Sequence, residues 1–248
     1  METKSKSALK SPAILLIVWA LILSASFIFS VFMHEDGHGL GAKIDGVHVS
    51  TGFNKVGDYG KSPDDPDFRT GGTKNAMWSG LLGPITTWLL AIIFTVWLYR
   101  FKVPSWGALT VGALAIVNCL IRAVPMAQFL VSALRGYPYM EDEVGWGIWT
   151  VLKFCRPDLA TSTLDYQVLV KTYAPTFLTN PTFWVPPLLS LTLSLACLIP
   201  AYWRNYKLWG ARFDNWRNRL LFGILPLATY FTSWPVLNWL DRLIRINW

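Results

Sequence analysis

The chain has 248 residues, of which 53% are hydrophobic and only 15% are charged, and its mean hydropathy is +0.36. This composition is too apolar for an ordinary soluble domain. The formal charge of +7 could indicate a nucleic-acid partner, but the basic residues gather at the ends of apolar stretches. That placement is typical of membrane topology and of contact with anionic lipid heads, so we expect no nucleic acid as a partner.

Apolar stretches of about 20 residues, the length that crosses a bilayer, recur along the chain. We expect an all-α polytopic membrane protein with about five to six transmembrane helices, a multi-pass protein of the cell membrane. The five predicted spans are Ser11–Met33, Asn75–Tyr99, Trp106–Leu134, Phe183–Trp203 and Leu220–Leu240. A sixth, short and interfacial, is expected at Val144–Phe154. Ser24-Ala25-Ser26 could serve as a signal-peptide cleavage site, but the apolar run continues beyond it, so we expect the first span to be retained.

Four regions follow from this pattern. They are a basic N-terminal tail (1–10), a membrane-embedded catalytic core (11–145) with a polar loop (45–74), an external amphipathic segment (146–182), and two C-terminal scaffold spans (183–248). In the loop, Gly46 and the run Val47-His48-Val49 predict a short β-hairpin. Gly37 and Gly41, four residues apart, predict the close approach of a second helix.

Basic clusters predict the orientation of the chain. They precede the first span, follow the second and fill the connection between the last two, which under the positive-inside rule places the N-terminus inside. The far end of the first span then faces outward. Arg242 and Arg245 near the C-terminus oppose this assignment.

The run His34-Glu35-Asp36-Gly37-His38 at the end of the first apolar stretch has the pattern H-E-x-x-H. On a helix, His34 and His38 share one face and can ligate a single zinc ion, while Glu35 can act on a metal-bound water. The bland alternative is a polar helix end with two histidines in water. Ionisable residues at a membrane-embedded position favour the functional interpretation.

A catalytic zinc takes three protein ligands and keeps one position open. The extended soluble-protease pattern would need a histidine at position 44, where this chain has Ile44. A carboxylate from another helix is the better candidate, and we choose Asp142, because the end of the third span returns to the side of His34. Glu141, Glu143 and His48 remain alternatives, and the acidic cluster could also be a solvated cap.

These motifs resemble the site-2 protease family of intramembrane zinc metalloproteases, over roughly residues 12–145. The resemblance rests on His34-Glu35-x-x-His38 after an apolar helix, on Ser79-Gly80-Leu81-Leu82-Gly83-Pro84 opening a second span, and on a later acidic residue. It implies a three-helix metalloprotease-like core. The family's N-x-x-P and L-D-G pattern on the third helix is absent, since Asn118 and Pro125 lie seven apart. Asp142 downstream corresponds to a divergent, minimal member.

The expected activity is zinc-dependent endoproteolysis of a membrane-spanning or membrane-proximal segment. Zn²⁺ is the expected cofactor, and a membrane protein or peptide the expected substrate. Glu35 would be the general base, His34, His38 and Asp142 the zinc ligands, and Asn118 a group that binds the substrate. Arg122, in the middle of the third span, requires a counter-charge or a watery cavity. The alternative is a non-proteolytic membrane protein whose zinc site is structural or handles metal.

Overall fold

The computed structural model describes residues 11–65, 77–160, 166–213 and 215–248. The fold is mostly helical, at 77%. Within the described ranges four helices are long and apolar enough to cross a membrane: α1 (Pro12–Ile44), α2 (Met77–Leu98), α3 (Trp106–Leu134) and α8 (Pro181–Trp209). Helices α9 (Trp216–Thr232) and α10 (Trp234–Leu243) meet at an angle of 42° and can count together as a fifth. The basic tail (1–10) and the stretch from 66 to the start of α2 lie outside the described residues.

The predicted spans correspond to these helices, with differences at their ends. The span Trp106–Leu134 matches α3. Helix α1 continues past the predicted end at Met33 to Ile44, so the His34–His38 turn belongs to the same uninterrupted helix. The short, interfacial sixth segment expected at Val144–Phe154 is present as a helix, and the described residues hold at most five candidate spans. Helix α4 (Asp142–Phe154) has 13 residues, too few for the roughly 20 that cross a bilayer.

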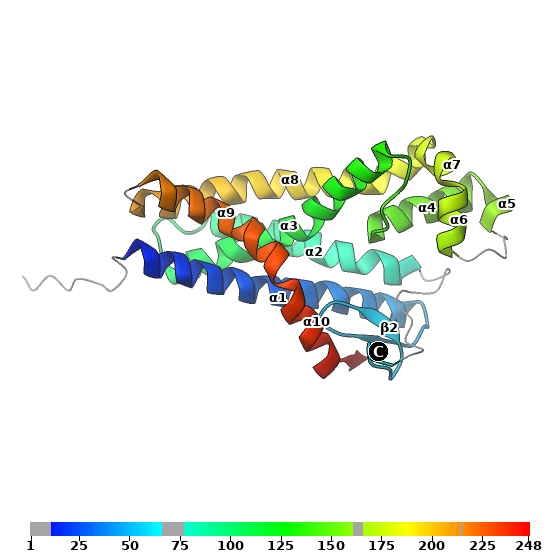
Figure 1. The fold of residues 1–248 in the computed structure, drawn as a ribbon, viewed down its shortest axis with the longest axis horizontal. Helices are drawn as coiled ribbons and strands as arrows, with labels where there is room; N and C mark the ends of the chain where they lie inside the picture. Colours follow the sequence, from blue (N-terminus) through cyan, green and yellow to red (C-terminus); the bar gives the residue numbers. More distant parts are fainter. Residues whose placement is uncertain (1–10, 66–76, 161–165, 214) are drawn as a thin grey trace, which may run out of the picture.

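The long helices form a bundle in which α1 and α8 lie on opposite sides of α2 and α3, and α9 crosses α1 (Figure 1). Large side chains fill the interior between them, among them Trp19, Phe27 and Ile116, each no more than 1% exposed. The outward faces are also apolar, with Leu21, Val96 and Ile199 more than half exposed. A helix that is apolar on both faces is typical of a membrane span.

A second, smaller core lies at one end of the bundle. Helix α4 and the short helices α5 (Pro157–Ala160), α6 (Tyr166–Thr172) and α7 (Ala174–Leu178) gather there, with α4 packed against α8 and α2. Val144, Ile148 and Val151, at helical spacing on one face of α4, are fully buried in a cluster that includes Phe129 and Phe183. This packing fixes α4 against the bundle.

A three-stranded antiparallel sheet lies at the same end of the bundle. Strands β1 (Val49–Thr51) and β2 (Val56–Asp58) form the predicted hairpin, and β3 (Ile246–Asn247) pairs with the other edge of β1, giving the order β2-β1-β3. The participation of the C-terminal segment was not predicted, and the term all-α is wrong to this extent. Asp241 secures the hairpin by accepting hydrogen bonds from the amides of Asn54 and Lys55.

The two ends of the bundle differ in character. The start of α1, the α2–α3 connection and the α8–α9 connection with its short helix η2 (Gly210–Arg212) lie at one end, opposite the sheet and α4–α7 (Figure 1). The predicted alternation of spans is consistent with this arrangement. His34 stands 22 residues after Pro12, about 33 Å along the helix at 1.5 Å per residue. The H-E-x-x-H turn therefore lies roughly one bilayer thickness from the start of α1.

Candidate metal centre

Glycines let α1 and α2 touch where the histidines project. A Cβ on Gly37 would lie 2.6 Å from the carbonyl oxygen of Leu82, and one on Gly41 would lie 2.1 Å from that of Trp78. The predicted close approach at Gly37 and Gly41 is thus confirmed. On α2, a Cβ at Gly83 would lie 2.3 Å from Nε2 of His38. The site consequently forms where glycines bring α1 and α2 into close contact.

Both histidines are oriented through their Nδ1 atoms by groups of α2. Nδ1 of His38 is hydrogen-bonded to the carbonyl oxygen of Ser79, and Nδ1 of His34 lies 2.9 Å from Oγ1 of Thr87. A carbonyl only accepts, and the Thr87 hydroxyl already donates to the carbonyl of Gly83 at 3.2 Å, so each Nδ1 must be the donor. In the neutral imidazole each Nε2 then carries an unprotonated lone pair, which is how second-shell groups prepare histidine for a metal.

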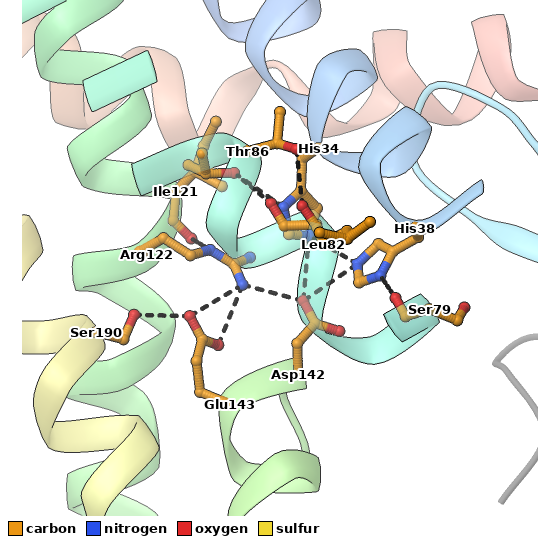
Figure 2. A network of polar contacts seen from close by, with 12 residues as sticks. His34, His38, Ser79, Leu82, Thr86, Ile121, Arg122, Asp142, Glu143 and Ser190 are labelled. Atoms are coloured by element: carbon orange, nitrogen blue, oxygen red, sulfur yellow. Dashed lines mark hydrogen bonds and ion pairs between the residues drawn. The ribbon is translucent and has the colours of Figure 1, made fainter. Parts of the chain in front are cut away.

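The two Nε2 atoms lie close to each other and to a carboxylate oxygen of Asp142 (Figure 2). Nε2 of His34 lies 3.1 Å from Nε2 of His38, and Oδ2 of Asp142 lies 3.1 Å from the first and 3.4 Å from the second. Ligands about 2.0–2.1 Å from a tetrahedral ion are separated by about 3.3–3.4 Å. The donor set of two imidazoles and one carboxylate, gathered at that separation, therefore fits a zinc ion.

Asp142 reaches the histidines because it stands in the first turn of α4. An acidic residue there is favoured by the helix dipole. The buried face of α4 holds this turn in place, and Gly147 allows close contact with α8, since a Cβ there would lie 2.3 Å from the carbonyl oxygen of Phe183. The third candidate ligand thus comes from a helix too short to span a membrane.

The alternative third ligands are not gathered with the two histidines. Burial raises the pKa of Glu141 to about 8, and neighbouring carboxylates add to this shift against the opposing charge of Arg122. At neutral pH Glu141 is therefore mostly protonated and is a poor ligand for a cation. Glu143 is fully buried and faces Arg122 and Ser190. His48 lies beside the C-terminal strand, with Nδ1 3.3 Å from the carbonyl oxygen of Trp248.

Glu35 occupies the position next to His34 and is 9% exposed. Its carboxylate forms no hydrogen bond or ion pair with any of the described residues. The neighbouring Asp36 differs, since it accepts a hydrogen bond from Thr51 of β1 at 3.2 Å. Of the two adjacent carboxylates, Asp36 is thus engaged by the sheet, and Glu35 is left as the candidate general base.

Arg122 and Asn118 lie one helical turn apart on α3 but have different surroundings. Arg122 is 5% exposed, and its Nη1 donates to Oδ2 of Asp142 at 3.0 Å and to Oε2 of Glu143 at 3.2 Å. The counter-charge expected for Arg122 is thus present. Asn118 is fully buried and donates to Oγ of Ser30 at 2.9 Å. It connects α3 to α1 and is not gathered with the three candidate ligands.

The formal charges of the site favour a divalent cation. With Glu35 ionised and both histidines neutral, the carboxylates of Glu35, Asp142 and Glu143 exceed the single guanidinium of Arg122 by two negative charges. Uncompensated charge is costly in a low-dielectric interior. A divalent ion on the three converging atoms would balance the excess.

Comparisons with known proteins find no matching family model, curated protein or solved structure. The candidate metal centre is described by its geometry alone, which is two histidines and one aspartate gathered in a helical bundle.

Thr87 and Ser190 were not singled out in the sequence, and the contacts of Ser79 and Glu143 were not predicted. Ser79 and Thr87 orient the histidines, while Glu143 pairs with Arg122 and accepts a hydrogen bond from Ser190. A signal for the first two existed, because Ser79, Gly83 and Thr87 follow at intervals of four and share one face of the predicted second span. The contact of Ser190 with Glu143 had no comparable signal, since 47 residues separate them.

Proposed function

We propose that this chain is a multi-pass membrane protein that hydrolyses a peptide bond, with a zinc ion on His34, His38 and Asp142 and with Glu35 as general base. The substrate would be a membrane-spanning or membrane-proximal segment of another protein or a peptide. The observation that carries the proposal is the convergence of two imidazole lone pairs and a carboxylate oxygen within 3.1–3.4 Å of one another. Three acceptors at that separation repel each other unless a proton or a metal ion lies between them, and a single zinc ion would contact all three at once.

The membrane assignment is supported by length and by surface. Four helices, or five with the bent pair, are long and apolar enough to span, and their outward faces carry exposed leucine, isoleucine and valine side chains. Basic residues such as Arg100, Lys102 and Arg217 belong to the end opposite the candidate metal centre. Under the positive-inside rule this centre would open toward the outer side.

The residues divide the chemistry of hydrolysis among them. A bound zinc ion would lower the pKa of a coordinated water and polarise the scissile carbonyl. Glu35 would accept the proton of the attacking water and return it to the leaving amine. Thr87 and Ser79 would keep the two imidazoles in the tautomer that ligates. A helical substrate segment would have to unwind locally before its backbone reached the site, so helix-breaking residues are expected near the cleaved bond.

The test is the variant Glu35→Gln, which keeps the side-chain size and removes the base. We expect it to bind zinc like the parent and to lose cleavage by at least about 100-fold, at the lower end of what general-base catalysis contributes. The probes are a fluorescent unstructured polypeptide in detergent and a reporter with a helix-breaking transmembrane segment in vesicles. Cleavage at the parental rate by Glu35→Gln would contradict the proposal.

Asp36→Asn is the matched control, because it neutralises the neighbouring carboxylate on the same turn. It should keep both zinc and cleavage. The alternative function is a structural or metal-handling zinc site. In that case the Glu35→Gln variant would keep the function of the protein, because no general base is needed. A structural site also generally has four protein ligands, whereas three candidate ligands are gathered among the described residues.

A further inference from the structure

Arg122 makes more contacts than charge neutralisation requires. Its Nη1 donates to Oε2 of Glu143 at 3.2 Å, which already pairs the guanidinium with a fully buried carboxylate. The same Nη1 also donates to Oδ2 of Asp142 at 3.0 Å, the oxygen that faces the two histidines. A pair serving stability alone would be complete without this second contact.

Glu143 is itself held from α8. Oγ of Ser190 donates to Oε1 of Glu143 at 2.7 Å, and Nε1 of Trp88 on α2 donates to Oγ of Ser190 at 3.2 Å. Both Ser190 and Glu143 are fully buried. Nε of Arg122 donates to the carbonyl of Ile121 at 3.1 Å, so the guanidinium is fixed at both ends (Figure 2).

From this geometry we propose that Arg122, held by Glu143 and Ser190, is a positioning residue that fixes the Asp142 carboxylate on the histidine pair. The inference rests on the metal site proposed above and adds to it a support that reaches from α8 through α4 and α3. A carboxylate side chain on the first turn of a helix can adopt several rotamers. A charge-assisted hydrogen bond from an immobile guanidinium selects the one that faces Nε2 of His34 and His38.

The two consecutive carboxylates, Asp142 and Glu143, then have different roles. Asp142 is available to a metal because Glu143 supplies the full counter-charge of Arg122. With Glu143 removed, Arg122 would compete with the metal for Asp142. With Arg122 removed, Asp142 would be released from its orientation and Glu143 would be buried without a partner, which costs several kcal/mol.

The experiment measures zinc affinity of the full chain in detergent, by competition with a chromophoric chelator, and records the visible spectrum of the cobalt-loaded protein. The main variant is the double substitution Arg122→Met with Glu143→Gln, because removing both charges leaves neither one buried alone. We expect about 10- to 100-fold weaker zinc binding, the usual effect of losing a second-shell partner, together with an altered cobalt spectrum. Arg122→Lys should lie between the double variant and the parent, because a lysine supplies the charge without the fixed fork.

Arg245→Met is the control. Its guanidinium pairs with the buried Asp241 at 3.2 Å and donates to the carbonyl oxygens of Ser50 and Lys55 in the sheet, so its removal should change stability and leave zinc affinity within about 2-fold. A folded double variant that binds zinc with parental affinity and an unchanged cobalt spectrum would overturn the inference. Absence of zinc from the parent would instead refute the proposed function.

Ser190→Ala covers the case in which the double variant fails to fold, because it removes a single hydroxyl. Loss of one hydrogen bond to Glu143 should weaken zinc binding by about 2- to 10-fold. Unchanged affinity in a folded Ser190→Ala protein would count against the inference.

Discussion

At the scale of single residues, the protonation of two imidazoles decides what the site can do. The H-E-x-x-H pattern supplies the histidines, and α2 supplies the acceptors that place each proton on Nδ1. The sequence predicted the pattern, but the tautomers depend on Ser79 and Thr87, which lie about 40 to 50 residues away. Such pairings follow from helix packing and cannot be obtained from spacing within α1.

Thr87→Val tests this orientation directly. Valine keeps the shape of threonine but cannot accept the proton of Nδ1 on His34, so we expect zinc binding about 10-fold weaker, the lower end of second-shell effects. Thr86→Val is the control, since that hydroxyl donates to the carbonyl of Leu82 within α2 and should leave the affinity unchanged. Equal affinities for the two variants, measured by chelator competition, would contradict the assigned tautomer.

The choice of Asp142 among three consecutive acidic residues shows what sequence could and could not decide. Alternation of the spans brought the whole cluster to the side of His34, and the structure gathers Asp142 with both histidines. That Asp142 is a ligand stays a prediction. The different tasks of Glu141 and Glu143 depend on burial and on Arg122, neither of which a local pattern reveals.

At the scale of elements, the contact between α1 and α2 controls the shape of the site. Most of the predicted spans lie within a few residues of the observed helices because apolar length is a strong signal. The pairing of β3 with β1 was missed because it joins segments almost 200 residues apart. A strand of two residues is too short to show the alternation of apolar and polar residues that predicts a strand.

Gly83→Ala tests the role of the helix contact. The added methyl would overlap the ring of His38, so we expect the ring to be displaced and zinc binding to fall by at least about 10-fold, as when a ligand loses its supporting geometry. Gly80→Ala is the matched control on the same helix, because among the described residues no atom beyond the adjoining turns of α2 lies within 4 Å of a Cβ at this position. It should retain zinc and gain up to about 1 kcal/mol of helix stability. Retention of parental zinc affinity by Gly83→Ala would contradict the described packing.

At the scale of the whole molecule, the structure has a basic end and an opposite end that carries the sheet, α4–α7 and the candidate metal centre. The sequence predicted this polarity from its charge clusters, apart from Arg242 and Arg245. Arg245 donates to the carbonyl oxygens of Ser50 and Lys55, so it is part of the sheet. The position of Arg245 is therefore explained by its contacts with the sheet and is weak evidence about the orientation of the chain in the membrane.

Accessibility to a membrane-impermeant thiol reagent tests the orientation. Cys155 is exposed immediately after α4, whereas Lys102 lies between α2 and α3. In intact cells Cys155 should react from outside, and a cysteine introduced as Lys102→Cys in a Cys155→Ser background should react only after the membrane is opened. Labelling of both residues from the same side would contradict a membrane-crossing bundle with opposite ends.

The central claim is that His34, His38 and Asp142 together hold one metal ion, and elemental analysis of the detergent-purified chain tests it most directly. The parent, loaded under zinc-replete conditions, should contain about one zinc per chain, and His38→Ala and Asp142→Asn should each lose it. If zinc is lost in His38→Ala but retained in Asp142→Asn, another residue must be the third ligand. A parent that holds no zinc would contradict the metal centre and, with it, the proposed hydrolysis.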